Sequence, residues 1–141
     1  MKKILIGIFV FSSLAFGKLQ DGKYYVEAEK ATWGWKPFTY IVVKDSKVVE
    51  VKHDRKNKEG KNATEDMKYN KSMAKKQGVG IKEAVGRLEK GFMESKNLDK
   101  VDSVAGATST SKEFKVMMKY LLNKAENGKP GSYKISNKDL I

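Results

Sequence analysis

The sequence DSVAGATSTS, residues 102–111, joins a run of small residues to the start of an amphipathic helix. Gly106 allows the backbone to approach a ligand closely because glycine has no side chain. The N–H groups at the start of a helix present a favourable dipole to an anion. The hydroxyl groups of Thr108, Ser109 and Thr110 supply further hydrogen-bond donors, so the stretch predicts a loop that holds a phosphate group.

A helix is predicted to follow this loop, with Thr110 as its N-cap and Glu113 completing a capping box. Its apolar positions recur at helical spacing: Phe114, Met117, Met118, Leu121, Leu122 and Ala125. Gly128 and Pro130 are expected to end it. Thr108 then lies two positions before the N-cap, where we expect its side chain to be exposed to solvent or to a modifying enzyme.

Asp102 and the triplet Gly106, Ala107 and Thr108 match the pattern D-x-x-[S/T]-G-A-T. In this respect the chain resembles the FMN-binding domain family, in which the final threonine takes FMN through a phosphodiester bond. The family includes flavin-carrying subunits of sodium-pumping NADH:quinone oxidoreductases and of Rnf-type complexes, and secreted electron-transfer flavoproteins of Gram-positive cells. Ala105 departs from the pattern because it stands where the family has Ser or Thr, which leaves non-covalent binding of FMN as an alternative.

The resemblance extends beyond the loop over nearly all of the chain after residue 17. Residues 21–24 are similar to the D-G-x-Y strand of the family, and residues 34–38 to the segment that enters its second strand. Residues 43–49 resemble its V-K-D-G-K-I-V hairpin, and residues 69–73 a Y-N-x-x-M helix of the secreted members. The implied fold is one small flavin domain.

The resemblance also implies roles for the loop residues. Gly106 and Ala107 would provide space and amide donors, and Ser109 and Thr110 would bind the phosphate or cap the helix. Asp102 would orient the loop or help to bind the metal of a flavin transferase. That enzyme takes FMN from FAD with magnesium, and the modified protein then carries electrons between membrane or envelope redox partners instead of acting as a stand-alone enzyme.

Aromatic residues outside the loop are candidates for contact with the flavin ring. Trp33 and Trp35 flank a glycine, and Trp35 lies in a segment that matches the family, with packing in the core or on the surface as the alternative for both. Tyr69 and Met73 are i, i+4 partners on one helix face, where ring contact and core packing are both open. Asn70 is a candidate for a hydrogen bond to the polar edge of the flavin.

Other catalytic and metal chemistry is not indicated. The chain has no cysteine, which excludes disulfides, thiolate metal sites, Fe–S clusters and a lipid-modified cysteine. His53 is the only histidine and ends a predicted strand among charged residues, so we expect it to be solvated. Ser109 and Ser111 lack a G-x-S-x-G context, and no hydrolase is predicted.

The chain of 141 residues has a formal net charge of +12. The lysines are scattered and no nucleic-acid motif occurs, so nucleic acid is not a predicted partner. A basic surface attracts acidic proteins or anionic cell-surface polymers. The alternative function is therefore a non-redox module that binds such a polymer in the cell envelope.

Residues 1–17 are predicted to be a signal peptide. Lys2 and Lys3 precede an apolar run, and a small-x-small end suggests cleavage after Gly17. An uncleaved anchor is the alternative, although the run is shorter than the roughly 20 residues that span a bilayer. Residues 18–141 would then form an exported FMN-binding domain, in a periplasm or at the cell surface.

The pattern of the remaining chain predicts an α+β fold, with a small antiparallel sheet packed against about three helices. Asp45 and Ser46 are expected to form a tight hairpin turn. The segment after Gly131 is either an edge strand or loose. The expected strands are residues 23–30, 38–44 and 48–53, and the expected helices are residues 62–76, which Asn62 and Glu65 would cap, 81–92 and 110–125.

Overall fold

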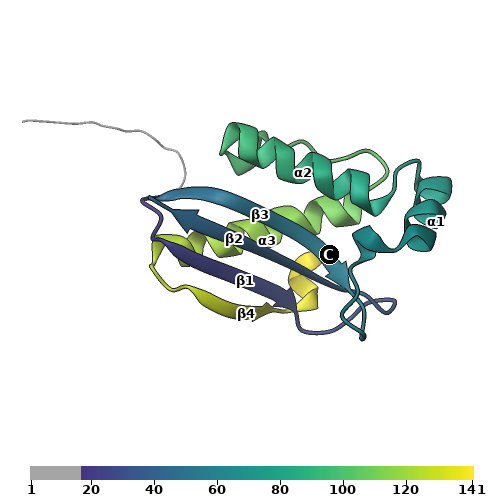
Figure 1. Ribbon diagram of the computed structural model, residues 1–141, viewed down its shortest axis with the longest axis horizontal. Helices are drawn as coiled ribbons and strands as arrows, with labels where there is room; N and C mark the ends of the chain where they lie inside the picture. The colour runs from purple at the N-terminus through teal and green to yellow at the C-terminus, as the bar shows by residue number, and fades with distance from the viewer. Residues whose placement is uncertain (1–16) are drawn as a thin grey trace, which may run out of the picture.

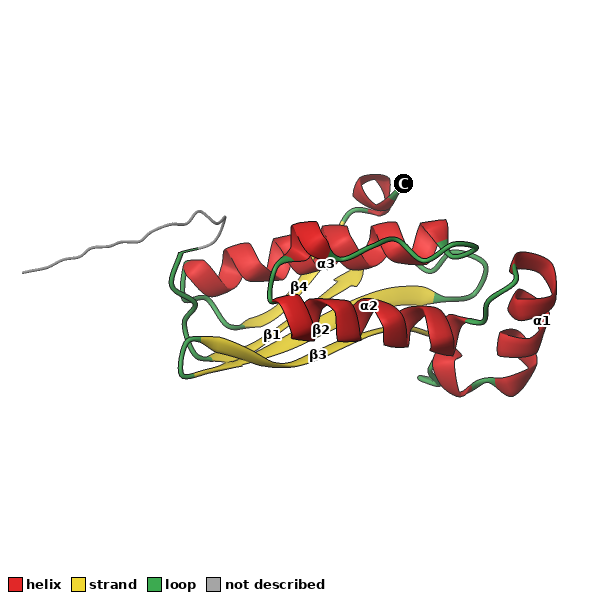
Figure 2. Cartoon of the chain, turned by 90° about the horizontal axis from the view of Figure 1, so that it is seen from above, coloured by secondary structure: helices red, strands yellow, loops and turns green. Residues whose placement is uncertain are grey.

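The computed structural model describes residues 17–141, so the predicted signal peptide lies, apart from Gly17, outside the described residues. One face of a four-stranded sheet is covered by two long helices (Figures 1 and 2). None of the helices in this range is long and apolar enough to cross a membrane. The elements are β1 (Gly22–Ala28), β2 (Lys36–Lys44), β3 (Lys47–Lys56), α1 (Met67–Gln77), α2 (Ile81–Ser95), α3 (Thr108–Glu126) and β4 (Gly131–Ile135).

The strand order is β3-β2-β1-β4, which confirms the predicted α+β fold. The first three strands pair antiparallel, and β4 joins the edge parallel to β1. The direction of β4 follows from α3, because the N–H of Gln20 donates to the carbonyl of Ala125 and so holds the end of α3 near the start of β1. The chain leaving α3 therefore enters the sheet beside Tyr24 and runs the same way as β1.

The predicted hairpin joins β2 to β3. Asp45 and Ser46 have φ angles of 53° and 64°, as a type I′ turn requires at both central positions. The turn lacks glycine, but the carboxylate of Asp21 accepts hydrogen bonds from both backbone N–H groups at 3.1 and 3.0 Å. The hydrogen bonds from Ser46 N and Asp45 N lower the pKa of Asp21.

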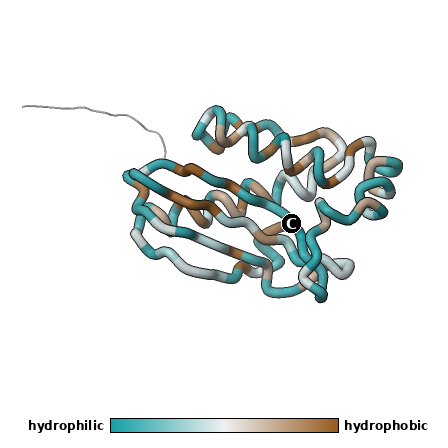
Figure 3. Tube along the Cα trace, viewed as in Figure 1, coloured by the Kyte–Doolittle hydropathy of each residue, from teal (hydrophilic) through white to brown (hydrophobic). Residues whose placement is uncertain are grey.

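The core lies between the sheet and the helices α2 and α3. All six apolar positions predicted for α3 are buried, and Ile81, Leu88 and Phe92 are buried on α2. No residue of α1 is fully buried, and in Figure 3 this helix is mostly hydrophilic while the strands carry the strongest hydrophobic colour. Figure 2 shows α1 at one end of the molecule, away from the sheet.

Two predicted helix starts are wrong. The helix α3 begins at Thr108 instead of after Thr110, its N-cap is Ala107, and Thr110 and Glu113 form no capping box because both side chains bind Arg55. The helix predicted for residues 62–76 is divided into two elements. Residues 63–65 form the 3-10 turn η2 (Ala63–Glu65), and α1 begins after Asp66, whose side chain accepts a hydrogen bond from the N–H of Tyr69 at 3.0 Å.

Candidate cofactor site

A cleft of about 760 Å³ opens where β1 and β3 end and β2 begins. Its walls come from the turn before β2, the end of β3, the starts of α1 and α3, and the 3-10 turn η4 (Asn137–Leu140). The volume lies within the roughly 300–1,000 Å³ of small-molecule and cofactor sites. The cleft brings together five residues that the sequence predicts as candidates for contact with the flavin or its phosphate: Trp33, Trp35, Tyr69, Thr108 and Ser109.

The start of α3 forms one wall of the cleft. The N-cap residue Ala107 has no side-chain acceptor, and the hydrogen bonds of the helix begin with Ser111 N to Ala107 O. The N–H groups of the first turn, including those of Thr108 and Ser109, therefore have no acceptor within the helix. Both side chains are exposed and line the cleft, so this wall suits a phosphate group.

The loop before α3 is held by the side chain of Ser111 and by close packing of Gly106 against the end of α1. The buried Ser111 hydroxyl accepts from Val104 N at 2.9 Å and donates to Ala107 O at 2.7 Å. Gly106 has a φ of 84°, and a Cβ at this position would lie 2.2 Å from the carbonyl oxygen of Gln77. The end of α1 therefore requires glycine at position 106, independently of any ligand.

An ion pair forms the floor of the cleft. Arg55 Nε and Nη2 donate to Glu113 Oε1 at 3.1 and 3.0 Å, and Nη2 also reaches Oε2 at 3.1 Å. Nη2 is 3.1 Å from the acceptor Oγ1 of the buried Thr110. Burial works to raise the pKa of Glu113, but the proximity of His53 and the charge of Arg55 hold it below its ordinary value.

Aromatic side chains form the rim and the second wall. Arg55 Nη1 donates to the hydroxyl of Tyr69 at 3.0 Å, and the rings of Tyr69 and Trp35 lie 5.1 Å apart at 45°. Trp33 is 93% exposed at the tip of the turn, with a φ of 54° that is unusual for a bulky residue. These faces offer apolar surface to a planar ring, while Arg55 keeps a second Nη1 hydrogen for a ligand.

The prediction that His53 is solvated is wrong, because its side chain is fully buried. β3 continues past this residue to Lys56, and α3 covers this face of the strand. Nδ1 lies 2.7 Å from the hydroxyl of Thr39, and Nε2 lies 3.8 Å from Glu113 Oε1. His53 therefore stands directly behind the ion pair of the cleft.

Six of the candidate residues do not line the cleft. Gly106, Ala107 and Thr110 lie in or behind the wall that α3 forms, and the N–H of Ala107 donates to the carbonyl of Val104. The other three lie farther away. Asp102 is exposed in a separate hollow between its loop and α2, which Arg87 and Lys100 also line. The amide of Asn70 donates to backbone carbonyls of Ala63, Thr64 and Asp66 and accepts from Lys82 N, which ties α1 to its neighbours.

Met73 is the last of the three residues that lie away from the α3 wall. It is half-buried and packs against both the main core and the small cluster around Ile81. Its position near Tyr69 is therefore explained by packing between α1 and α2.

Sequence reasoning missed Arg55 and assigned Glu113 and Thr110 only to helix capping or phosphate binding. The available signal was composition: only two of the 29 basic residues are arginine, and Arg55 is one of them. Arginine is the residue that matches a carboxylate or phosphate with two parallel hydrogen bonds.

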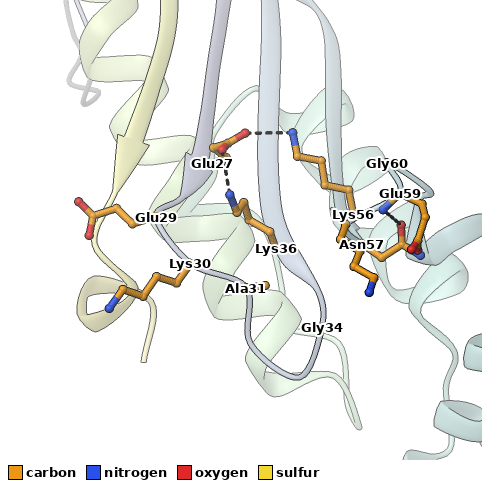
Figure 4. Close-up of a pocket in the computed structure, with 11 residues that line it drawn as sticks. Glu27, Glu29, Lys30, Ala31, Gly34, Lys36, Lys56, Asn57, Glu59 and Gly60 are labelled. Carbon is orange, nitrogen blue, oxygen red and sulfur yellow. Dashed lines mark hydrogen bonds and ion pairs between the residues drawn. The ribbon is translucent and has the colours of Figure 1, made fainter.

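A second hollow of about 960 Å³ opens beside the ends of β1 and β3 (Figure 4). Its central charges are paired: Lys36 and Lys56 donate to the carboxylate of Glu27 at 3.4 and 3.0 Å. Burial opposes the charged form of Glu27, yet these partners lower its pKa. None of the loop residues 102–111 lines this hollow, so we place the candidate site in the other cleft.

Two solved structures share this fold. A CPE2226 protein crystal structure from Clostridium perfringens superposes with a TM-score of 0.78 at 36% identity, covering 84% of this chain and 98% of that one. A solution NMR structure from Clostridium thermocellum, at 24% identity, covers 77% and 93% of the two chains with a TM-score of 0.51 and shows a similar fold.

A "15 kDa lipoprotein" of Treponema pallidum (strain Nichols) is 31% identical over 125 residues, which are 89% of this chain and 86% of that protein. The profile of the FMN-binding domain matches residues 32–123, which include the turn with Trp33, the ion pair and the loop before α3. The free N–H groups, the aromatic walls and Arg55 fit the phosphate and the ring of this cofactor. The chain belongs to the FMN-binding domain family, and its cofactor is FMN.

Proposed function

We propose that the chain is an exported electron carrier whose FMN is attached covalently to Thr108. The observation that carries this proposal is the position of Thr108, which is exposed, begins α3 and lines the cleft. A phosphate on its hydroxyl would lie next to the N–H groups of the first helical turn. The family pattern assigns the attachment to this same threonine.

The attachment requires a flavin transferase that uses FAD and magnesium. The hydroxyl oxygen of Thr108 forms a bond to the FMN phosphorus of FAD, and the pyrophosphate bond to AMP breaks. AMP leaves, and the hydroxyl proton passes to a base or to solvent. Exposure of Thr108 supports this step because an enzyme must reach it.

Within the cleft, the chain would hold the ring and define its surroundings. Trp33, Trp35 and Tyr69 offer aromatic faces, and Arg55 offers its remaining N–H to the polar edge of the ring. FMN, when bound, supplies the electron transfer, and the protein tunes it through these neighbours.

Export is supported by the sequence and by one relative. Residues 1–17 have the charge and apolar pattern of a signal peptide. The Treponema relative is named a lipoprotein, which fits the cell envelope. A covalently held cofactor cannot be lost by dilution outside the cytoplasm, and the basic surface suits acidic redox partners or anionic polymers there.

The test expresses residues 18–141 with a flavin transferase, FAD and magnesium, and examines the denatured band for flavin fluorescence. Thr108→Ala should be dark and should lack the added mass of FMN, and the control Ser103→Ala, at an exposed position outside the cleft, should fluoresce like the wild type. A yellow native protein that is dark after denaturation would show FMN bound without the covalent link. A colourless protein that binds anionic polymer with steep salt dependence would support the non-redox module.

A further inference from the structure

His53 Nε2 is a buried side-chain atom for which the described residues provide no hydrogen-bond partner. The ring is fully buried, lies edge-on to Phe114 at 5.8 Å between centroids, and is held by Thr39 at Nδ1. A buried polar atom without a partner is rare in native proteins and points to a role.

The charged groups around His53 come from three elements. On α3, Glu113 Oε1 lies 3.8 Å from Nε2, and on α2, Glu89 Oε2 accepts from the backbone N of His53 at 2.8 Å. On β3 itself, Arg55 shares the face of His53, whereas Lys52 and Asp54 are on the opposite face because side chains alternate along a strand. Of these groups, only Glu113 is recorded within 4 Å of a ring nitrogen.

The hydrogen bonds of Thr39 bear on the protons of the ring. Its hydroxyl lies 3.3 Å from the acceptor Met117 Sδ as well as 2.7 Å from His53 Nδ1. When the hydroxyl proton of Thr39 points to Met117, Nδ1 of His53 must carry the proton that it donates to Thr39. In the neutral ring Nε2 then has a lone pair, which faces the negative carboxylate of Glu113 and is repelled by it. A proton on Nε2 makes the ring positive and replaces this repulsion with an attraction between opposite charges.

Glu113 Oε1 connects His53 to the cleft, because it also accepts from Nε and Nη2 of Arg55. We propose that His53 is a positioning residue for the cofactor: a proton on Nε2 shares Glu113 with Arg55 and makes the floor of the cleft more positive. Reduction of FMN adds negative charge to the cleft and so favours this protonated state. The electrons come from an added reductant such as dithionite, and the proton comes from solvent and stays on the imidazole.

The proton site itself is tested on the chain without cofactor. Because the chain has one histidine, an untagged protein labelled with ¹⁵N-histidine gives the ring signals of His53 alone. We expect the ring nitrogen signals of the folded protein to show a proton on Nε2 beside one on Nδ1, and this doubly protonated form to be less populated at the same pH in Glu113→Gln. Glu89→Gln is the matched control, because Glu89 contacts the backbone of His53, and it should reduce this form less. A folded protein whose ring never carries both protons, or an equal reduction in both variants, would overturn the proton site.

The effect on the cofactor rests on the proposed function and is measured separately. Protein whose FMN content has been confirmed by intact mass is titrated with dithionite at a series of pH values. The midpoint potential should rise more steeply toward low pH in the wild type than in His53→Gln. Equal slopes in the two loaded proteins would refute the coupling. Failure to load FMN would instead count against the proposed function, and the ring nitrogen signals of His53 would still decide the proton site.

Discussion

Gly106 illustrates how a single residue of the motif is fixed by the fold. Its φ of 84° and its contact with the carbonyl of Gln77 both exclude a side chain. Gly60 has a similar φ of 82°, but a Cβ at this position would have nothing within 4 Å, so the two positions share the left-handed conformation and differ in the space available.

Gly106→Ala should therefore destabilise the protein more than Gly60→Ala. The left-handed conformation alone costs an alanine about 1 kcal/mol, and displacement of the loop from α1 should bring the total for Gly106→Ala to about 3 kcal/mol. Urea unfolding of the two variants and the wild type measures both values. Equal losses would show that the contact with Gln77 is unimportant.

Ala105 is the residue at which the chain departs from the family pattern. It is exposed beside Asp102, so a larger side chain can be accommodated. Ala105→Ser should raise the initial rate of FMN attachment because it restores the hydroxyl that the transferase meets in other members. The rate is followed by in-gel fluorescence over time, with Ser103→Ala as a control, and an unchanged rate would show that position 105 is not read.

At the scale of elements, one ion pair joins β3 to α3. Arg55 and Glu113 have side-chain exposures of only 15% and 14%, and removing one partner leaves the other charge without compensation. An apolar pair of similar volume can replace such ions at little cost.

Arg55→Leu should therefore lower the free energy of unfolding by about 3 kcal/mol. The double variant Arg55→Leu with Glu113→Leu should regain most of this loss. Denaturant unfolding of the two single variants and the double variant completes the cycle. Additive losses would contradict coupling across the pair.

Elements differ in how far local sequence defines them. The apolar stripe of α3 was correctly predicted because periodicity depends on neighbours within the helix. The start of α3 was not, since the side chains of Thr110 and Glu113 bind Arg55, more than 50 residues away in the sequence. The hairpin turn without glycine was predicted, but its support by Asp21 was visible only in the structure.

For the whole molecule, the carboxylates with lowered pKa values predict a loss of stability in acid. Asp21, Glu27 and Glu113 all have folded pKa values below the ordinary 3.8 or 4.5. They stabilise the fold above those values, and this contribution is lost as the pH falls through the lower folded values. Burial raises the pKa of Glu89, which therefore acts in the opposite direction.

The melting temperature should fall below about pH 4.5 as these three groups take up protons. The fall should be smaller in Glu27→Gln, which has no carboxylate to protonate at this position, although that variant should melt lower at pH 7. Thermal melts between pH 3 and pH 7 make the comparison. Parallel curves for the two proteins would show that Glu27 contributes nothing to the acid transition.

The sequence by itself determined the family, the cofactor and the α+β class, and it singled out Thr108, although only the structure showed that this residue begins α3. These follow from a short contiguous motif and from local periodicity, and both are properties of neighbouring residues. Only the tertiary structure decided that Trp33, Trp35 and Tyr69 share a cleft with Thr108, that Asp102 and Asn70 do not, and that His53 lies buried behind the floor of this cleft. The physical reason is that burial and contact between distant segments depend on how helices pack across the sheet, which no local pattern contains.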